Sequence, residues 1–260
     1  MNLSLTRRAF LKTAAALAGG LLLPDIQAAW ANPGAPPTLW HGSRNLSLIS
    51  LSFDDCYLLD SLHELETLSD AYPSMRLTLF PVGVALLNTN AKDEGIWQRL
   101  VSKGHEVGYH SYDHSEDTPP SKMSDSAMLV DYERWYEVYS QVLGDKPVIR
   151  FARPPFGDLS YSFLNLCAKN ELTPAMWSIS WGKTFTDMKP EVKKIIKGDI
   201  ILLHVRNPDV DNLRHALPFL RGTGLRMVTL SELLFMEVPE TSEGGESMPG
   251  MREARRIYPR

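Results

Sequence analysis

The sequence has few cysteines, little excess charge and no long apolar run, and each of these absences excludes a class of protein. Only two of its 260 residues are cysteines, Cys56 and Cys167, which excludes a disulfide framework. The formal net charge of −4 gives no reason to expect nucleic acid or an anionic membrane surface as a partner. The apolar run at residues 14–23 is shorter than the roughly 20 apolar residues that span a bilayer, so no stable membrane anchor is expected.

The first 31 residues have the pattern of a twin-arginine export signal. Arg7 and Arg8 precede the apolar run, which ends at Pro24, and residues 29–31 (Ala-Trp-Ala) offer the small residues that a signal peptidase reads. We therefore expect residues 1–31 to be a signal peptide, the twin-arginine export machinery to be a partner, and the mature protein to be periplasmic or extracellular. A cytoplasmic protein with an apolar start is the alternative. Because this route exports folded proteins, a metal can be bound before export.

Strand and helix patterns alternate about seven times after the signal. Apolar or alternating strand patterns are present at 46–53, 76–83, 105–110, 148–152, 175–179, 199–205 and 226–230. Helical patterns are present at 57–70, 92–104, 121–144, 161–170, 190–198, 211–224 and 231–236. This alternation predicts an α/β fold with a parallel sheet covered by helices. The last segment, 239–260, has few apolar residues and is predicted to be a disordered tail.

Polar side chains capable of chemistry fall at the carboxyl ends of the predicted strands. They are Asp54, Asp55, His110, His114, Arg153, Trp181 and His204. In a closed parallel barrel these strand ends meet at one mouth, where active sites form. Residues spread over 150 positions of the sequence are therefore expected to share one cleft.

His110 and His114 are candidate metal ligands, or else polar residues of a solvated loop. If their segment turns helically, both rings lie on one side and reach one ion. Asp54 and Asp55 are costly to bury unpaired, and their alternative role is to cap a helix N-terminus. With one aspartate as a third ligand, the two histidines would leave an open position for water, and the other aspartate could accept a proton from that water.

Arg153 and His204 are the other candidates for chemistry at the mouth. Arg153 opens the stiff turn RPPFG, which favours a fixed guanidinium that clamps a carboxylate over an exposed surface arginine. Leu202 and His204 share one face of their strand by its period of two. Taken alone, a histidine at the end of an apolar strand favours a structural role, in which the buried ring is hydrogen-bonded within the core. At a mouth shared with a metal it is a candidate general acid.

Four motifs resemble those of the NodB-like polysaccharide deacetylases of carbohydrate esterase family four. They are SFDD at 52–55, HSYDH at 110–114, RPPFG at 153–157 and LLH at 202–204. The resemblance covers roughly residues 46–236 and implies an irregular (β/α)7 barrel. It also implies that an N-acetylated polysaccharide or oligosaccharide is the substrate, and that a divalent metal, usually zinc, is the cofactor.

The resemblance also implies a role for each matching residue. Asp54 would be the base, oriented by Arg153, and His204 would protonate the departing amine. The metal ligands would be Asp55, His110 and His114. The remaining substrate contacts would be the backbone amide near Phe156 at the oxyanion, Leu202 at the acetyl methyl group, and Trp181.

The sequence departs from the family pattern at two places. Cys56 stands where relatives usually have glycine after the aspartate pair. Its thiol is either a small packed group or an additional contact to the metal. Relatives usually have an Asp-Trp pair after the strand at 175–179, but this chain reads SWGKTFTD and has no acid there. Trp181 can stand in for the tryptophan, and Asp187 is a candidate to reach back as the acid.

Three functions remain open from the sequence. The first is a metal-dependent hydrolase that removes N-acetyl groups from an envelope or extracellular polysaccharide, with an O-acetyl esterase as its variant. The second is an exported carbohydrate-binding protein that has kept the barrel but is catalytically impaired, which the missing acid favours. The third is an iron oxygenase, because two histidines and one carboxylate also hold iron. An aspartate placed as a base beside the ligands favours hydrolysis.

Overall fold

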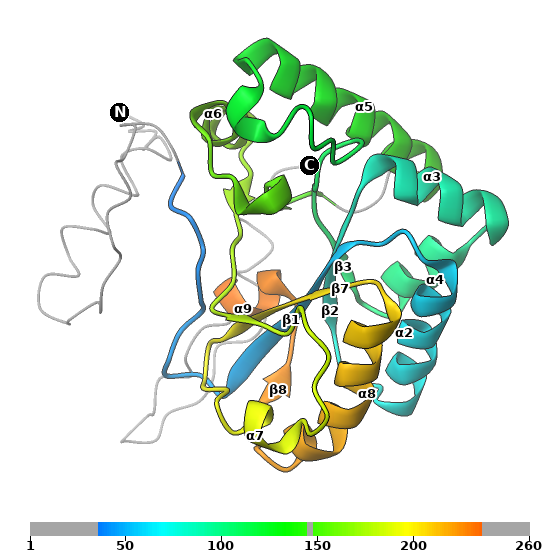
Figure 1. Ribbon diagram of the computed structural model, residues 1–260, viewed down its shortest axis with the longest axis vertical. Coiled ribbons are helices and arrows are strands. Elements are labelled where there is room, and N and C mark those ends of the chain that lie inside the picture. The colour runs from blue at the N-terminus through cyan, green and yellow to red at the C-terminus, as the bar shows by residue number, and fades with distance from the viewer. Residues whose placement is uncertain (1–35, 145–147, 236–260) are drawn as a thin grey trace, which may run out of the picture. The chain divides into compact units, whose positions relative to one another are not determined.

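The computed structural model describes residues 36–144 and 148–235, so the predicted signal peptide (1–31) and the whole of the predicted tail (239–260) lie outside the described residues. A six-stranded parallel sheet has the order β3-β2-β1-β7-β6, and β8 pairs with the start of β1 (Figure 1). Its strands are β1 Leu48–Asp55, β2 Leu77–Pro81, β3 Glu106–Val107, β6 Ile179–Ser180, β7 Ile200–His204 and β8 Arg226–Met227. The predicted α/β class with a parallel sheet is confirmed.

Two further strands, β4 (Phe151–Ala152) and β5 (Thr173–Pro174), form a parallel pair of their own. A single bridge between Tyr109 and Ala152 links this pair to the segment that follows β3. Within the described residues, no ladder of hydrogen bonds joins β5 back to β6. The circle of strands is therefore irregular and is not closed by hydrogen bonds.

The strand predicted at 175–179 is wrong in its position. Only its last residue, Ile179, belongs to a strand, and the segment 175–178 lies between β5 and β6. The carbonyl oxygens of Ala175 and Met176 instead accept hydrogen bonds from the Arg153 guanidinium, at 2.9 and 3.0 Å. A side chain that is distant in sequence thus takes backbone groups that a regular strand would pair with its neighbour.

The helices are α2 Leu59–Ala71, α3 Gly83–Lys92, α4 Ile96–Ser102, α5 Asp125–Leu143, α6 Tyr161–Lys169, α7 Lys189–Val192, α8 Asn207–Arg221 and α9 Leu230–Phe235. The helix predicted at 92–104 is only partly right, because α3 ends at its start and Gly95, at φ 102°, separates α3 from α4. Ser124 caps α5, which begins at Asp125, four residues after the start of the helix predicted at 121–144, and Gly144 ends it. Helix α8 begins four residues earlier than predicted.

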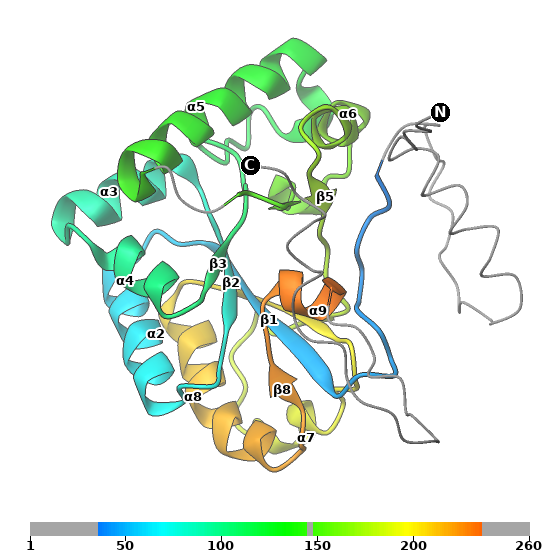
Figure 2. The ribbon, with the colours of Figure 1, turned by 180° about the vertical axis from the view of Figure 1, so that it is seen from behind.

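Most helices pack on the outer face of the sheet, whereas α9 lies against the inner face, where its Leu230 and Leu233 cluster with Leu48 and Ile200. Helix α2 lies beside α8 and α4, and α5 lies beside α3 and α6 (Figure 1), while the reverse view shows α9 next to β1 (Figure 2). Along β1 the residues alternate: Leu51 and Phe53 join the main hydrophobic core, whereas Ser52 and Asp54 are buried on the opposite face. This alternation aims Asp54 into the inner space.

None of the helices in the described ranges combines the length and the apolarity needed to cross a membrane.

Candidate active site

Strands β1 and β7 place the predicted base and the predicted acid side by side. Their parallel register pairs Ser52 with Leu202 and Asp54 with His204. Because side chains alternate along both strands, these four residues lie on the same face of the sheet. Neither aspartate of the pair caps α2, which begins at Leu59 after the uncapped position Leu58, so the helix-cap interpretation is wrong.

Arg153 clamps Asp54 as predicted. Its Nη1 donates to Asp54 Oδ1 at 2.7 Å and to Ser52 Oγ at 2.9 Å. The guanidinium is fully buried, and its remaining nitrogens are held by the two backbone carbonyls of the segment before β6. Burial lowers the pKa of Arg153, which the Asp54 carboxylate opposes. A buried ion pair held by this many additional hydrogen bonds fixes the orientation of the carboxylate.

The structure brings together Asp55, His110 and His114, the three residues predicted to be metal ligands. The Asp55 Oδ1 lies 3.6 Å from His110 Nε2 and 3.7 Å from His114 Nε2, and one ligand atom from each residue lies within 4.8 Å of the others. Ligands bound to tetrahedral zinc at 2.0–2.1 Å are about 3.4 Å apart, so this donor set fits a zinc ion with a further position open. The His110 Nδ1 donates to the Arg153 carbonyl at 2.8 Å, which turns Nε2 toward Asp55.

The charges around this set favour a bound cation. Burial raises the pKa of the Asp55 carboxyl, but the attraction of His110 and His114 outweighs it and lowers that pKa below its usual value. Burial lowers the pKa of His110, but the Asp54 and Asp55 carboxylates outweigh it and raise that pKa. Two carboxylates thus stabilise positive charge at this point, whether the cation is a proton or a metal ion.

Left-handed turns, and not a helix, bring the two histidines together. Six non-glycine residues in the described ranges have positive φ, and five of them lie in the turns that build the site. These five are Asp55, Cys56, Ser111, His114 and Phe156. The ring centroids of His110 and His114 are 5.0 Å apart, so the predicted convergence is confirmed although the predicted helical turn is wrong. Such strained backbone is typical of functional sites.

The predicted substrate contacts differ in their accessibility. Phe156 is 53% exposed, and its ring contacts that of His114 at 4.4 Å between centroids. Leu202 is buried at the inner face beside Ser52. Trp181 is fully buried within the main hydrophobic core, and this position does not favour a contact between its ring and a substrate. The roles of these three residues stay predictions.

Cys56 is a packed thiol. It is fully buried, burial raises its pKa well above the usual value, and its Sγ lies 3.9 Å from the Phe53 carbonyl oxygen. A thiol that stays protonated is a poor metal ligand. The group of potential ligands that the structure assembles includes Asp55 and omits Cys56.

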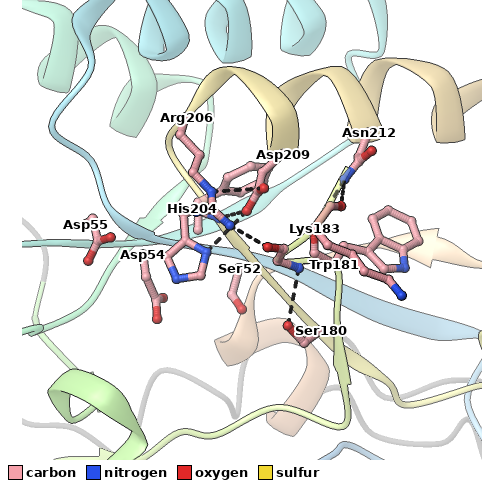
Figure 3. A network of polar contacts seen from close by, with 12 residues as sticks. Ser52, Asp54, Asp55, Ser180, Trp181, Lys183, His204, Arg206, Asp209 and Asn212 are labelled. Atoms are coloured by element: carbon pink, nitrogen blue, oxygen red, sulfur yellow. Dashed lines mark hydrogen bonds and ion pairs between the residues drawn. The ribbon is translucent and has the colours of Figure 1, made fainter. Parts of the chain in front are cut away.

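The acid that lies beside His204 is Asp209, a residue that the sequence reasoning missed. Asp209 is fully buried in the first turn of α8, and its Oδ2 lies 3.2 Å from His204 Nδ1 (Figure 3). Asp187 is exposed and accepts a hydrogen bond from the Lys189 amide, so the expectation that it reaches back is not supported. The signal for Asp209 was Asn-Pro-Asp, because proline and an acid favour the first turn of a helix.

Comparison with known proteins relates this chain to deacetylases. The polysaccharide deacetylase family model matches residues 41–175. A peptidoglycan-N-acetylglucosamine deacetylase of Bacillus cereus is 25% identical over 215 residues, which are 75% of this chain and 92% of that protein. The uncharacterized protein YlxY of Bacillus subtilis is 26% identical over 154 residues, 54% of this chain. The chain spans about half the length of YlxY, since the match covers 47% of it.

Solved structures show the same fold. The Bc1960 peptidoglycan N-acetylglucosamine deacetylase superposes with a TM-score of 0.64 at 21% identity, over 77% of this chain and 94% of that one. BA3943 from Bacillus anthracis, described as a CE4 family pseudoenzyme, superposes with a TM-score of 0.65 at 18% identity, over 76% of this chain and 69% of that one. The family match spans half of the sequence and includes Asp54, the three potential ligands and Arg153. The chain belongs to the polysaccharide deacetylase family.

Proposed function

We propose that this protein is a metal-dependent hydrolase that removes N-acetyl groups from a polysaccharide of the cell envelope or surroundings. The observation that carries the proposal is the buried Asp54–Arg153 pair directly beside the ligand set Asp55, His110 and His114. The pair places a fixed carboxylate next to the residues that we propose to hold a cation. A hydrolase needs a base at this place, whereas an iron oxygenase does not, so the arrangement favours hydrolysis.

In the proposed reaction, Asp55, His110 and His114 hold a divalent cation, which we propose to be zinc. When bound, the ion supplies Lewis-acid chemistry, lowering the pKa of water and polarising the acetyl carbonyl. Asp54 accepts the proton of the attacking water. Arg153 holds the Asp54 carboxylate pointed inward, and loss of either partner of this buried pair would leave the other charge without a partner.

His204 stands across the sheet register from Asp54 and is partly exposed, so it can deliver a proton to the departing nitrogen. We assign the backbone amide near Phe156 to the oxyanion and Leu202 to the acetyl methyl group. A base and an acid on neighbouring strands thereby flank the carbonyl carbon, and acetate and a free amine leave.

The names of the relatives support a glycan built from N-acetylglucosamine as the substrate. Two peptidoglycan-N-acetylglucosamine deacetylases of Bacillus cereus are each 25% identical to this chain. The pattern of residues 1–31 supports export by the twin-arginine route to the periplasm or the exterior, which fractionation of cells that express the full chain checks. Hydrolysis of O-acetyl groups is the variant that the same residues could perform.

A catalytically impaired carbohydrate-binding protein is the second candidate. It is favoured by the missing acid after residues 175–179 and by a fold shared with BA3943, described as a pseudoenzyme. Against it stand the intact Asp54, the complete ligand set and a His204 that has a carboxylate partner.

Acetate release separates the two candidates. Zinc-loaded wild type should release acetate from oligomers of N-acetylglucosamine, and Asp54→Asn should release it about 10²- to 10⁴-fold more slowly, the usual contribution of a positioned base. The variant's zinc content and circular dichroism should match those of the wild type. Binding of the oligomers without acetate release by a folded, zinc-loaded wild type would instead establish the binding protein.

A further inference from the structure

We propose that Asp209 is a positioning residue that holds His204 in the orientation and tautomer needed to deliver a proton. This inference rests on the proposed function, because it assigns a partner to the proposed acid. Neither residue lies in the segment that the family model matches, which ends at residue 175.

One oxygen of Asp209 holds both the ring and the backbone of His204. Its Oδ2 accepts the backbone N–H of His204 at 2.7 Å and lies 3.2 Å from the ring Nδ1. A carboxylate oxygen can only accept here, so Nδ1 carries a proton. The second ring nitrogen, Nε2, is thereby left to face the site, and Figure 3 shows the imidazole on the side of β7 toward Asp54.

The other oxygen ties this pair to the loop where the acid is missing. Asp209 Oδ1 accepts from Arg206 Nε at 3.1 Å, and Arg206 Nη2 donates to the Gly182 carbonyl at 2.6 Å (Figure 3). Asn212 also donates to a carbonyl of this loop, that of Lys183, at 2.7 Å. Helix α8 therefore contributes the Asp209 carboxylate, and hydrogen bonds from Arg206 and Asn212 hold the loop after β6 against this helix.

The position requires a carboxylate because all of its partners are donors. If Asn stood at 209, its NH2 group would face either Arg206 Nε or the N–H groups of His204, and one donor would be left unpaired. The residue is fully buried, so water cannot replace the lost acceptor.

The test combines kinetics with the protonation state of His204. Asp209→Asn should lower kcat about 10- to 100-fold, as loss of the partner that orients a functional histidine does, with KM and zinc affinity unchanged. Asp211→Asn is the matched control, because Asp211 lies on the same helix, is more exposed and pairs with Arg214. This control should retain wild-type kcat.

A double variant separates positioning from a general loss of structure. In a His204→Gln background, Asp209→Asn should leave the residual kcat unchanged, because the proposed effect on kcat requires the imidazole. If Asp209→Asn lowered kcat by the same factor in that background, the proposal would be overturned. It would also be overturned if the single variant Asp209→Asn had the same kcat as the control Asp211→Asn.

A spectroscopic measurement tests the role of Asp209 even if the wild type releases no acetate. In ¹⁵N spectra of zinc-loaded protein, neutral His204 should be protonated at Nδ1, and Asp209→Asn should mix the two tautomers. An inactive wild type with this signature contradicts the proposed function alone, whereas His204 protonated at Nε2 in the wild type overturns the role of Asp209.

Discussion

Strand β3 has a histidine on each side, and the two are used in opposite ways. Before the strand, His105 is buried with both ring nitrogens paired: Nδ1 accepts from the Leu77 amide at 3.1 Å and Nε2 lies 2.8 Å from Ser69 Oγ. After the strand, only Nδ1 of His110 is hydrogen-bonded, to the Arg153 carbonyl, and Nε2 faces Asp55 at 3.6 Å, beyond ordinary hydrogen-bond length.

This difference separates a structural histidine from a candidate ligand without reference to sequence motifs. At the amino end of the sheet, the protein satisfies its own buried polar groups, and Glu106 is held by Ser231 and Thr78 in the same way. At the carboxyl end, by contrast, one potential ligand atom from each of Asp55, His110 and His114 lies within 4.8 Å of the others. The same substitution, histidine to asparagine, tests both ends, because the amide can replace Nδ1 but not Nε2.

The largest effect is expected for His110→Asn. The new amide can still donate to the Arg153 carbonyl, but the ligand atom is lost. We expect zinc affinity to fall by more than about 100-fold, since losing even an outer hydrogen-bond partner of a metal-bound histidine costs 10- to 100-fold. A competition titration against a zinc chelator measures it. Affinity within a few-fold of wild type would show that His110 is not a ligand.

His105→Asn should leave zinc affinity intact and change the dependence of stability on pH. Burial lowers the pKa of His105 from 6.5 to about 4. Because the unfolded state takes up the proton first, His105 costs no stability above pH 6.5 but destabilises the fold progressively as the pH falls toward 4. The full loss is about 3 kcal/mol, at 1.36 kcal/mol per pKa unit.

Urea unfolding of zinc-free protein between pH 7.5 and 4 measures this loss. The wild type should lose about 3 kcal/mol more than His105→Asn over this range, while His215→Asn, a change at an exposed histidine of α8, should follow the wild type. Equal pH slopes for wild type and His105→Asn would contradict a neutral, buried His105.

The smallest effect is expected for Cys56→Ala. The thiol lies at the carboxyl end directly after Asp55, but it packs near the Phe53 carbonyl and stays protonated. Zinc affinity should stay within about 2-fold of the wild-type value in the same competition titration, because no ligand is removed. A fall of tenfold or more would make Cys56 a fourth ligand.

The sequence predicted most of the ligand end of the site, because each of its residues directly follows a strand or belongs to a stiff turn. Asp54 and Asp55 end or follow one predicted strand, Arg153 follows another in a stiff turn, and their meeting was expected because the carboxyl ends of parallel strands converge. The approach of His114 to His110 was predicted for the wrong reason, since left-handed residues such as Ser111 leave no mark on hydrophobic periodicity.

The acid end was less predictable, because it depends on where a helix begins. Hydrophobic spacing put the start of α8 at residue 211, while the structure begins it at Asn207 and so brings Asp209 under His204. Nothing in the sequence indicated that most of the strand predicted at 175–179 would not form. The carbonyl oxygen of Ala175 accepts a hydrogen bond from Arg153, which is 22 residues away in sequence. Contacts of this kind are decided by tertiary packing and not by local pattern.

The most direct test of the whole account is the dependence of acetate release on zinc. Wild-type protein is assayed on N-acetylglucosamine oligomers as purified, after removal of the metal by a chelator, and after zinc is restored. The account predicts that acetate release stops and then returns, while release by zinc-loaded Asp54→Asn stays about 10²- to 10⁴-fold slower than that of the wild type. Acetate release that persists at the same rate in the zinc-free protein would contradict it, as would no release by a folded, zinc-loaded wild type.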